Sequence, residues 1–245
     1  MEKRERFYFI DVLRGIAVLS MVLYHFMWDL RFIARLPFKD YPDRLDFLWQ
    51  QSICWTFILV SGFCFYLARR PFINGIKVLL GGVLVSLVTI FLTPDSAIYF
   101  GVLIFHGSAM LITLPLRKFL YKIPPILGAV LSFLLFVFFY SVSDKSLAFG
   151  LIELPKSLYQ NMFTAYLGFP HSGFFSADYF PLLPWIFLFL TGFFLSGTVK
   201  EKPPKFLYFK VPVFEWIGKN ALIIYLLHQP VLYAVTELII TLRGV

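Results

Sequence analysis

Charge is scarce in this sequence, and that scarcity sets the class of protein. Only 15% of the 245 residues are charged, whereas 59% are hydrophobic and 20% are aromatic. Soluble domains typically contain about 25% charged residues. The composition therefore excludes a water-soluble domain with one core and indicates a polytopic membrane protein.

Cysteine and internal repetition are also nearly absent. The two cysteines, Cys54 and Cys64, fall on one expected helix about 80° apart in direction, so they cannot form a disulfide with each other. No metal-ligand spacing appears, and we expect no bound metal. The chain shows no repeat, no low-complexity tract and no long linker. We therefore expect one polytopic membrane domain over residues 1–245.

Long apolar runs are what the sequence has in abundance. We count about seven stretches of roughly twenty residues, each long enough to cross a hydrocarbon layer of about 30 Å. Such segments must be helical, because the bilayer offers no partners to backbone N–H and C=O groups. We therefore expect an all-α integral membrane bundle of about seven transmembrane helices. The expected helices are residues 9–30, 47–67, 72–92, 97–116, 124–142, 181–199 and 216–242.

The basic residues predict the orientation of this bundle. Lysine and arginine collect on cytoplasmic loops, and a cytoplasmic N-terminus places roughly fourteen of them inside against roughly seven outside. The net charge of +8 is then topological, and no nucleic-acid partner is expected. We expect a multi-pass protein of the cell inner (plasma) membrane. The long connection 143–180 falls outside, where the amphipathic stretch 151–166 predicts short interfacial helices.

The first apolar segment carries four ionisable side chains that a simple anchor does not need. Asp11, Arg14, His25 and Asp29 fall within a stripe about 60° wide on a helix, and we call them the polar rail. Arg14 and His25 are about 16 Å apart along the axis. Because charge inside a membrane is costly, the polar rail is a candidate functional site.

The spacing suggests how the polar rail could work. Asp29 lies one turn beyond His25, where a carboxylate could fix the imidazole tautomer and raise its basicity. Asp11 lies one turn before Arg14 and could hold its guanidinium extended. A structural ion pair with a hydrogen-bonded histidine explains the same spacing.

Three segments, taken together, resemble the acyltransferase type 3 family. Arg14 and His25 have the arginine, ten residues, histidine spacing of its first helix. Residues 57–63, Phe-Ile-Leu-Val-Ser-Gly-Phe, resemble its second-helix motif, and residues 217–231 resemble its closing Tyr-Leu-x-His-x-Pro stretch. Residues 11–15, 100–103 and 178–181 look more like the sister group, the bacterial relatives of heparan-alpha-glucosaminide N-acetyltransferase.

The resemblance implies transfer of an acyl group, usually acetyl, from cytoplasmic acyl-CoA to an acceptor across the membrane, often a sugar or amino sugar. Arg14 would position the acetyl-CoA donor. His25, with Asp29 beside it, would act as general base or as a transient acyl carrier, and both alternatives stay open. Further donor-binding candidates are Ser61, Arg69, Arg70 and Lys77. The non-catalytic alternatives are helix packing for the serine and the usual excess of positive charge on cytoplasmic loops for the three basic residues.

Candidate acceptor-binding residues lie deeper in the bundle and in the outer loop. They are His106, His171, Asp178 and His228, although histidines inside bundles also bond across helices for structural reasons. The family has more helices than the seven counted here. The acceptor side of the bundle could therefore be covered by fewer helices than in the family. A second copy of the chain in a homodimer could also supply the missing part.

A second class of function also fits the sequence. A b-type haem carrier would use two of His25, His106 and His228 as axial ligands. A small proton-coupled transporter would use the polar rail as a relay. Such transporters usually consist of two related halves, and the sequence shows no such repeat.

Overall fold

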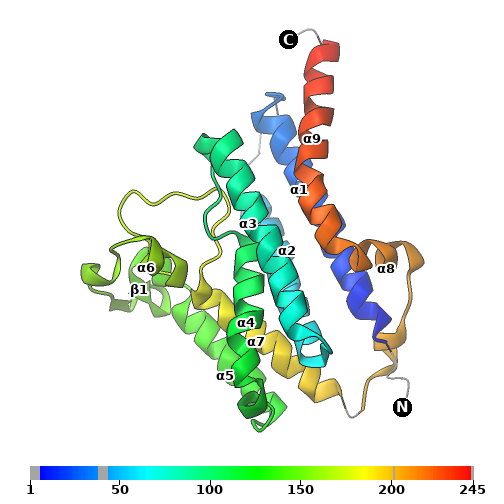
Figure 1. Ribbon diagram of the computed structural model, residues 1–245, viewed down its shortest axis with the longest axis vertical. Coiled ribbons are helices and arrows are strands. Elements are labelled where there is room, and N and C mark those ends of the chain that lie inside the picture. Colours follow the sequence, from blue (N-terminus) through cyan, green and yellow to red (C-terminus); the bar gives the residue numbers. More distant parts are fainter. Residues whose placement is uncertain (1–5, 38–43, 201, 244–245) are drawn as a thin grey trace. The chain divides into compact units, whose positions relative to one another are not determined.

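The computed structural model describes residues 6–37, 44–200 and 202–243 (Figure 1). Seven helices in this part of the chain are long and apolar enough to cross a membrane, counting the 3₁₀ turn that extends α5 to Asp144. They are α1 (Tyr8–Phe32), α2 (Arg44–Leu67), α3 (Pro71–Leu92), α4 (Val102–Leu120), α5 (Pro125–Phe139), α7 (Leu182–Val199) and α9 (Ala221–Arg243). The expected all-α membrane bundle is confirmed. The cytoplasmic position of the N-terminus stays a prediction.

The chain divides into two compact units. Met1–Phe57 and Pro203–Val245 form one, which we call the terminal unit, and Ile58–Lys202 form the other, the central unit. Helix α2 begins in the terminal unit and ends in the central unit. The expected single domain over 1–245 stays a prediction, and each unit is described separately.

In the terminal unit, α1 packs against the short helix α8 (Pro212–Lys219) and against α9, which follows α8 in the chain (Figure 1). Two glycines allow the backbones of α1 and α8 to touch. A Cβ at Gly15 would lie 1.9 Å from the carbonyl oxygen of Phe214, and a Cβ at Gly218 would lie 1.9 Å from that of Asp11. No other residue type could take either position without moving one helix away from the other.

The last apolar segment is broken, where we predicted one helix over residues 216–242. The break lies at Asn220, which ends α8 with φ −100° and ψ 14°. Its side-chain Nδ2 donates to the carbonyl oxygen of Trp216 over 2.9 Å, and its own carbonyl begins the hydrogen-bond ladder of α9. The prediction of one continuous helix was wrong, because an asparagine side chain can satisfy the backbone groups that a helix end exposes.

In the central unit, α3 packs on α4 and α5 packs on α7. Helices α2 and α7 also approach closely, since a Cβ at Gly62 would lie 1.9 Å from the carbonyl oxygen of Phe189. The core between these helices is rich in aromatic rings. Its fully buried phenylalanines are Phe65, Phe105, Phe136, Phe189 and Phe193.

The outer connection differs in detail from the sequence prediction. Helix α4 begins at Val102, not at residue 97, because residues 97–101 are held by the segment before α7. There the N–H of Ala177 donates to the carbonyl of Ala97 over 3.1 Å, and that of Phe180 to Phe100 over 2.9 Å.

The expected short helices of this connection are present, although only about half of residues 151–166 is helical. A hairpin of strands β1 (Ser146–Leu147) and β2 (Ile152–Glu153) precedes helix α6 (Met162–Leu167). Asn161 caps α6, accepting hydrogen bonds from the N–H groups of Phe163 and Thr164. The location of this connection at the membrane interface stays a prediction.

The glycine contact between α1 and α8 can be tested by adding one methyl group. Gly218→Ala should lower the thermal unfolding temperature in detergent, because the new Cβ meets backbone that cannot rotate away. Overpacking of this kind costs about 1–3 kcal/mol, which exceeds the gain of roughly 1 kcal/mol in helix propensity. Gly75→Ala is the control, since the nearest atoms to its Cβ would be side-chain atoms of Leu111 and Met110 at 3.1–3.3 Å. Equal effects of the two changes would contradict the close-contact argument.

Candidate intramembrane histidine site

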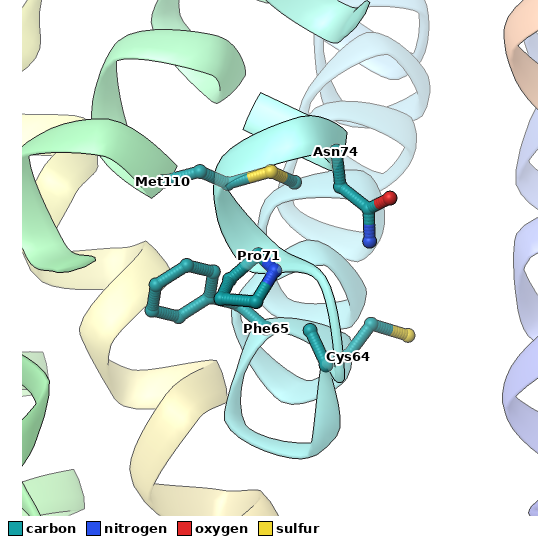
Figure 2. A pocket seen from close by; sticks show the side chains of 6 residues that line it. Cys64, Phe65, Pro71, Asn74 and Met110 are labelled. Carbon is teal, nitrogen blue, oxygen red and sulfur yellow. The ribbon is translucent and has the colours of Figure 1, made fainter. Parts of the chain in front are cut away.

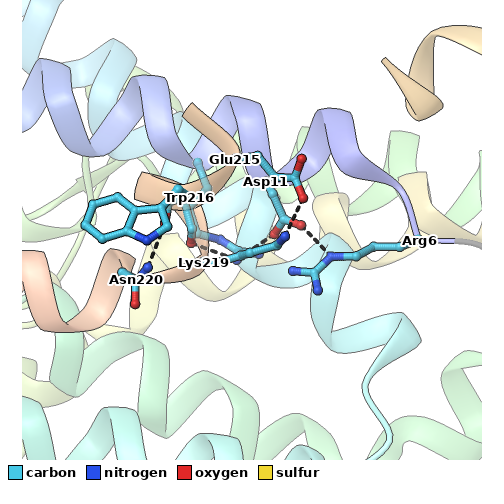
Figure 3. A network of polar contacts seen from close by, with 8 residues as sticks. Arg6, Asp11, Glu215, Trp216, Lys219 and Asn220 are labelled. Atoms are coloured by element: carbon cyan, nitrogen blue, oxygen red, sulfur yellow. Dashed lines mark hydrogen bonds and ion pairs between the residues drawn. The ribbon is translucent and has the colours of Figure 1, made fainter. Parts of the chain in front are cut away.

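The first end of the polar rail is an ion-pair network on α1 and α8 (Figure 3). The buried carboxylate of Asp11 accepts a hydrogen bond from Arg6 Nε at 2.7 Å and another from Arg14 Nη1 at 3.2 Å. On α8, Lys219 forms an ion pair with Glu215 one turn earlier. The buried Asp11 is thus balanced by two guanidinium groups, which removes most of the cost of burying a carboxylate.

Arg14 is also tied to the neighbouring helix. Its Nη1 donates to the carbonyl oxygen of Gly218 at 3.3 Å, which is possible because α8 lies so close to α1 at this glycine. The guanidinium therefore has a fixed position at the point where the two helices cross. A fixed guanidinium with five donors is suited to holding a phosphate or carbonyl oxygen.

The second end of the polar rail faces α9. The rings of His25 and His228 lie 5.0 Å apart between centroids and are tilted by 53°. His228 Nδ1 donates to the carbonyl oxygen of Tyr225 at 2.5 Å. Two histidines about 200 positions apart in sequence therefore share one site inside the terminal unit.

Asp29 lies beside this pair but binds a residue that the sequence analysis did not name. Its fully buried carboxylate accepts hydrogen bonds from Gln229 Nε2 at 3.1 Å and 3.4 Å. Within the described residues, no hydrogen bond joins Asp29 to His25, so Asp29 fixes Gln229 and not the imidazole. Gln229 could have been suspected from its place next to His228 in the closing motif.

The histidine pair also bears on the haem alternative. The rings of His25 and His228 are in contact, which leaves no room for a porphyrin between them. The third candidate ligand, His106, belongs to the central unit, where it is buried and its Nδ1 donates to the carbonyl oxygen of Val102 at 2.7 Å. The arrangement does not favour a haem carrier.

The predicted cationic patch lies in the central unit at the turn between α2 and α3. Arg69 and Arg70 are exposed there, and Lys77 is exposed two turns into α3. Another basic residue has a structural role at this turn. Arg117 of α4 donates through Nη2 to the carbonyl oxygens of Tyr66 at 2.6 Å and Ala68 at 3.2 Å, which caps the end of α2.

A pocket opens beside the same turn (Figure 2). Its volume is about 50 Å³, and it is lined by Cys64, Phe65, Ala68, Pro71, Asn74 and Met110. Such a volume holds one or two water molecules and not a nucleotide. Ser61 lies one turn earlier on α2, and its buried Oγ has no hydrogen-bond partner among the described residues.

The outer-loop candidates have separate positions in the central unit. Asp178 Oδ2 accepts from the N–H of Val102 at 3.0 Å and so caps α4 from the segment before α7. Burial raises the pKa of this carboxyl to about 6. His171 Nδ1 bonds the carbonyl oxygen of Ser172 at 2.9 Å, and its ring lies edge-on to Phe174. Asp178 therefore has a structural contact that the sequence did not predict.

These features define the class of the molecule as a polytopic membrane protein in which two histidines meet between two of the apolar helices. A profile of the family described as heparan-alpha-glucosaminide N-acetyltransferase, catalytic, matches residues 6–230, and the chain belongs to this family. It is therefore a membrane acetyltransferase. Comparisons with curated proteins and with solved structures gave no match.

The raised pKa of Asp178 gives a pH-dependent stability. Between about pH 4 and pH 6 the folded protein binds more protons at this carboxyl than the unfolded chain does, so stability falls as pH rises through this window. Asp178→Asn keeps an oxygen for the Val102 N–H but cannot ionise. We expect the unfolding temperature to fall less between about pH 4 and about pH 8 in this variant than in the wild type.

The matched control for this measurement is Asp144→Asn, which changes an exposed carboxylate in the same outer connection. It should leave the pH dependence of the unfolding temperature as in the wild type. Parallel curves for wild type and Asp178→Asn would show that the Asp178 carboxyl does not cause the dependence.

Proposed function

We propose that the protein moves an acetyl group from cytoplasmic acetyl-CoA to an extracytoplasmic acceptor, a sugar or an amino sugar. The family description supports the acetyl group and the amino-sugar class of acceptor. Arg14 positions the donor, and His25 acts as general base or as transient acyl carrier. The protein works as a multi-pass enzyme of the inner (plasma) membrane with its N-terminus in the cytoplasm.

One observation carries this proposal. Two segments from opposite ends of the chain place His25 against His228, with the anchored Arg14 three turns earlier on the same face of α1. Arg14 and His25 are about 16 Å apart by helical rise, which is comparable with the reach of a pantetheine arm. A donor held at Arg14 could thus present its thioester to His25.

The other candidate residues bind either the donor or the acceptor in this proposal. Arg69, Arg70 and Lys77 attract the nucleotide phosphates at the cytoplasmic surface, and Ser61 offers the donor a hydroxyl. His106, His171, Asp178 and His228 contribute to acceptor binding. Besides the donor and the acceptor, the protein interacts with the lipid bilayer. A second copy of the chain in a homodimer would cover the acceptor side of the bundle.

Removing the central imidazole tests the proposal. His25→Ala should lower acetyl transfer to glucosamine by about 100- to 10,000-fold, the usual range for a positioned acid-base group. Acetyl-CoA affinity should stay close to that of the wild type, measured by titration calorimetry in detergent. Phe26→Ala removes a ring of similar size from the neighbouring position without removing a base, and it should keep most of the activity. A fully active His25→Ala enzyme would rule out the central role of this residue.

The cationic patch is tested through donor binding. The double change Arg69→Ala and Arg70→Ala should weaken acetyl-CoA binding by about 10-fold or more, because charge-assisted contacts to phosphate are lost. The double change Lys118→Ala and Lys122→Ala removes the same charge from two other exposed residues. If both doubles weaken binding equally, the patch attracts the donor only through net charge and contains no specific site.

A further inference from the structure

The histidine site contains hydrogen-bond acceptors that have no donor. His228 Nε2 and Gln229 Oε1 are both buried, and neither has a hydrogen-bond partner in the described part of the chain. They lie beside two residues of α1, since His25 contacts the His228 ring and Asp29 binds Gln229. Buried polar atoms are nearly always paired, so two unpaired acceptors at one place indicate a missing donor.

The protonation of His228 follows from its neighbour. Its Nδ1 faces the carbonyl oxygen of Tyr225, and a carbonyl oxygen can only accept a hydrogen bond. Nδ1 must therefore carry the proton. In the neutral imidazole, Nε2 then has a lone pair and is a proton acceptor.

The orientation of Gln229 follows in the same way. The carboxylate of Asp29 accepts, so the amide group of Gln229 turns its Nε2 toward it. Oε1 is thereby left as a second acceptor. Asp29 and Gln229 together hold an acceptor oxygen at the site without taking part in the histidine contact.

We propose that His228 is a second catalytic residue, whose Nε2 takes the proton from the nucleophilic N–H or O–H of the acceptor, while Gln229 Oε1 accepts a hydrogen bond that orients it. This inference rests on the proposed acetyl transfer. The acceptor atom forms a bond to the acetyl carbonyl carbon. In direct transfer, the bond from that carbon to the thioester sulfur breaks, and the electron pair leaves with the sulfur. In the carrier route, a His25 nitrogen has first bonded to this carbon while CoA left as the thiolate, and the bond to nitrogen then breaks with its electron pair returning to His25. The proton on Nε2 then passes to the thiolate of CoA or to water.

A proton-accepting His228 changes the role proposed for His25. With the acceptor's proton going to His228, His25 serves the donor side, by polarising or carrying the acetyl group. The short distance between the two rings suits such a division, because both must reach the same carbonyl carbon. Asp29 is a positioning residue in this scheme, since it acts through Gln229.

The decisive experiment compares His228→Gln and His228→Ala with the wild type, using acetyl-CoA and glucosamine as probe substrates. We expect each change to lower the rate constant of transfer by about 100- to 10,000-fold without changing acetyl-CoA affinity. Added imidazoles of increasing basicity should restore the Ala variant in proportion to their basicity, which a structural role would not produce. Tyr233→Phe changes an exposed side chain of the same helix and should transfer acetyl at the wild-type rate.

The pH dependence of the transfer rate distinguishes a proton-accepting His228 from a purely structural one. The titratable groups near His228 are His25 and Asp29 on α1 and Tyr225 on its own helix. The rate should rise with pH through an imidazole titration in the wild type, and this rise should be absent in His228→Gln. A His228→Gln enzyme with the wild-type rate and profile would overturn the assignment and leave the proposed function intact. A folded wild type that transfers acetyl to neither amine nor hydroxyl probes would contradict the proposed function itself.

Discussion

The site of the terminal unit depends on one backbone contact, that between α1 and α8 at Gly15 and Gly218. This contact brings the carbonyl of Gly218 within reach of Arg14. It also determines where α9 begins, because only Asn220 separates α8 from α9. His25 meets His228 about three turns further along from this contact, so their approach follows from the two glycines that let the helices come together.

The buried carboxylates at the two ends of the polar rail, Asp11 and Asp29, have different kinds of partner. At one end, Asp11 is paired with two guanidinium groups, so its contacts are satisfied without a ligand. At the other end, the partner of Asp29 among the described residues is a neutral amide, and two nearby acceptors have no donor in this part of the chain. The first end is built to hold its own charges in place. The second end has acceptors that could receive a donor from a substrate, and for that reason it is the better candidate for chemistry.

The sequence predicted what depends on local pattern and missed what depends on partners. Apolar run length predicted the seven spans, and the 3.6-residue period placed Arg14 and His25 on one face. The break at Asn220 was missed, because an asparagine can either continue a helix or end it. Which of the two occurs depends on the backbone groups that its side chain can reach in the folded protein. The pairing of Asp29 with Gln229 was missed because it joins the two ends of the chain. Spacing on α1 alone favoured His25 as the nearer partner.

The family match includes every residue of the polar rail and its partners on α8 and α9. The match begins at Arg6, which donates to Asp11, and ends at residue 230, directly after Gln229. Helix α9 continues to Arg243, and many of its later side chains are exposed. The first ten residues of α9 rise only about 15 Å, half of a hydrocarbon layer. The part of α9 that contains His228 and Gln229 is therefore too short to span a hydrocarbon layer by itself, and the residues up to Arg243 supply the remaining length.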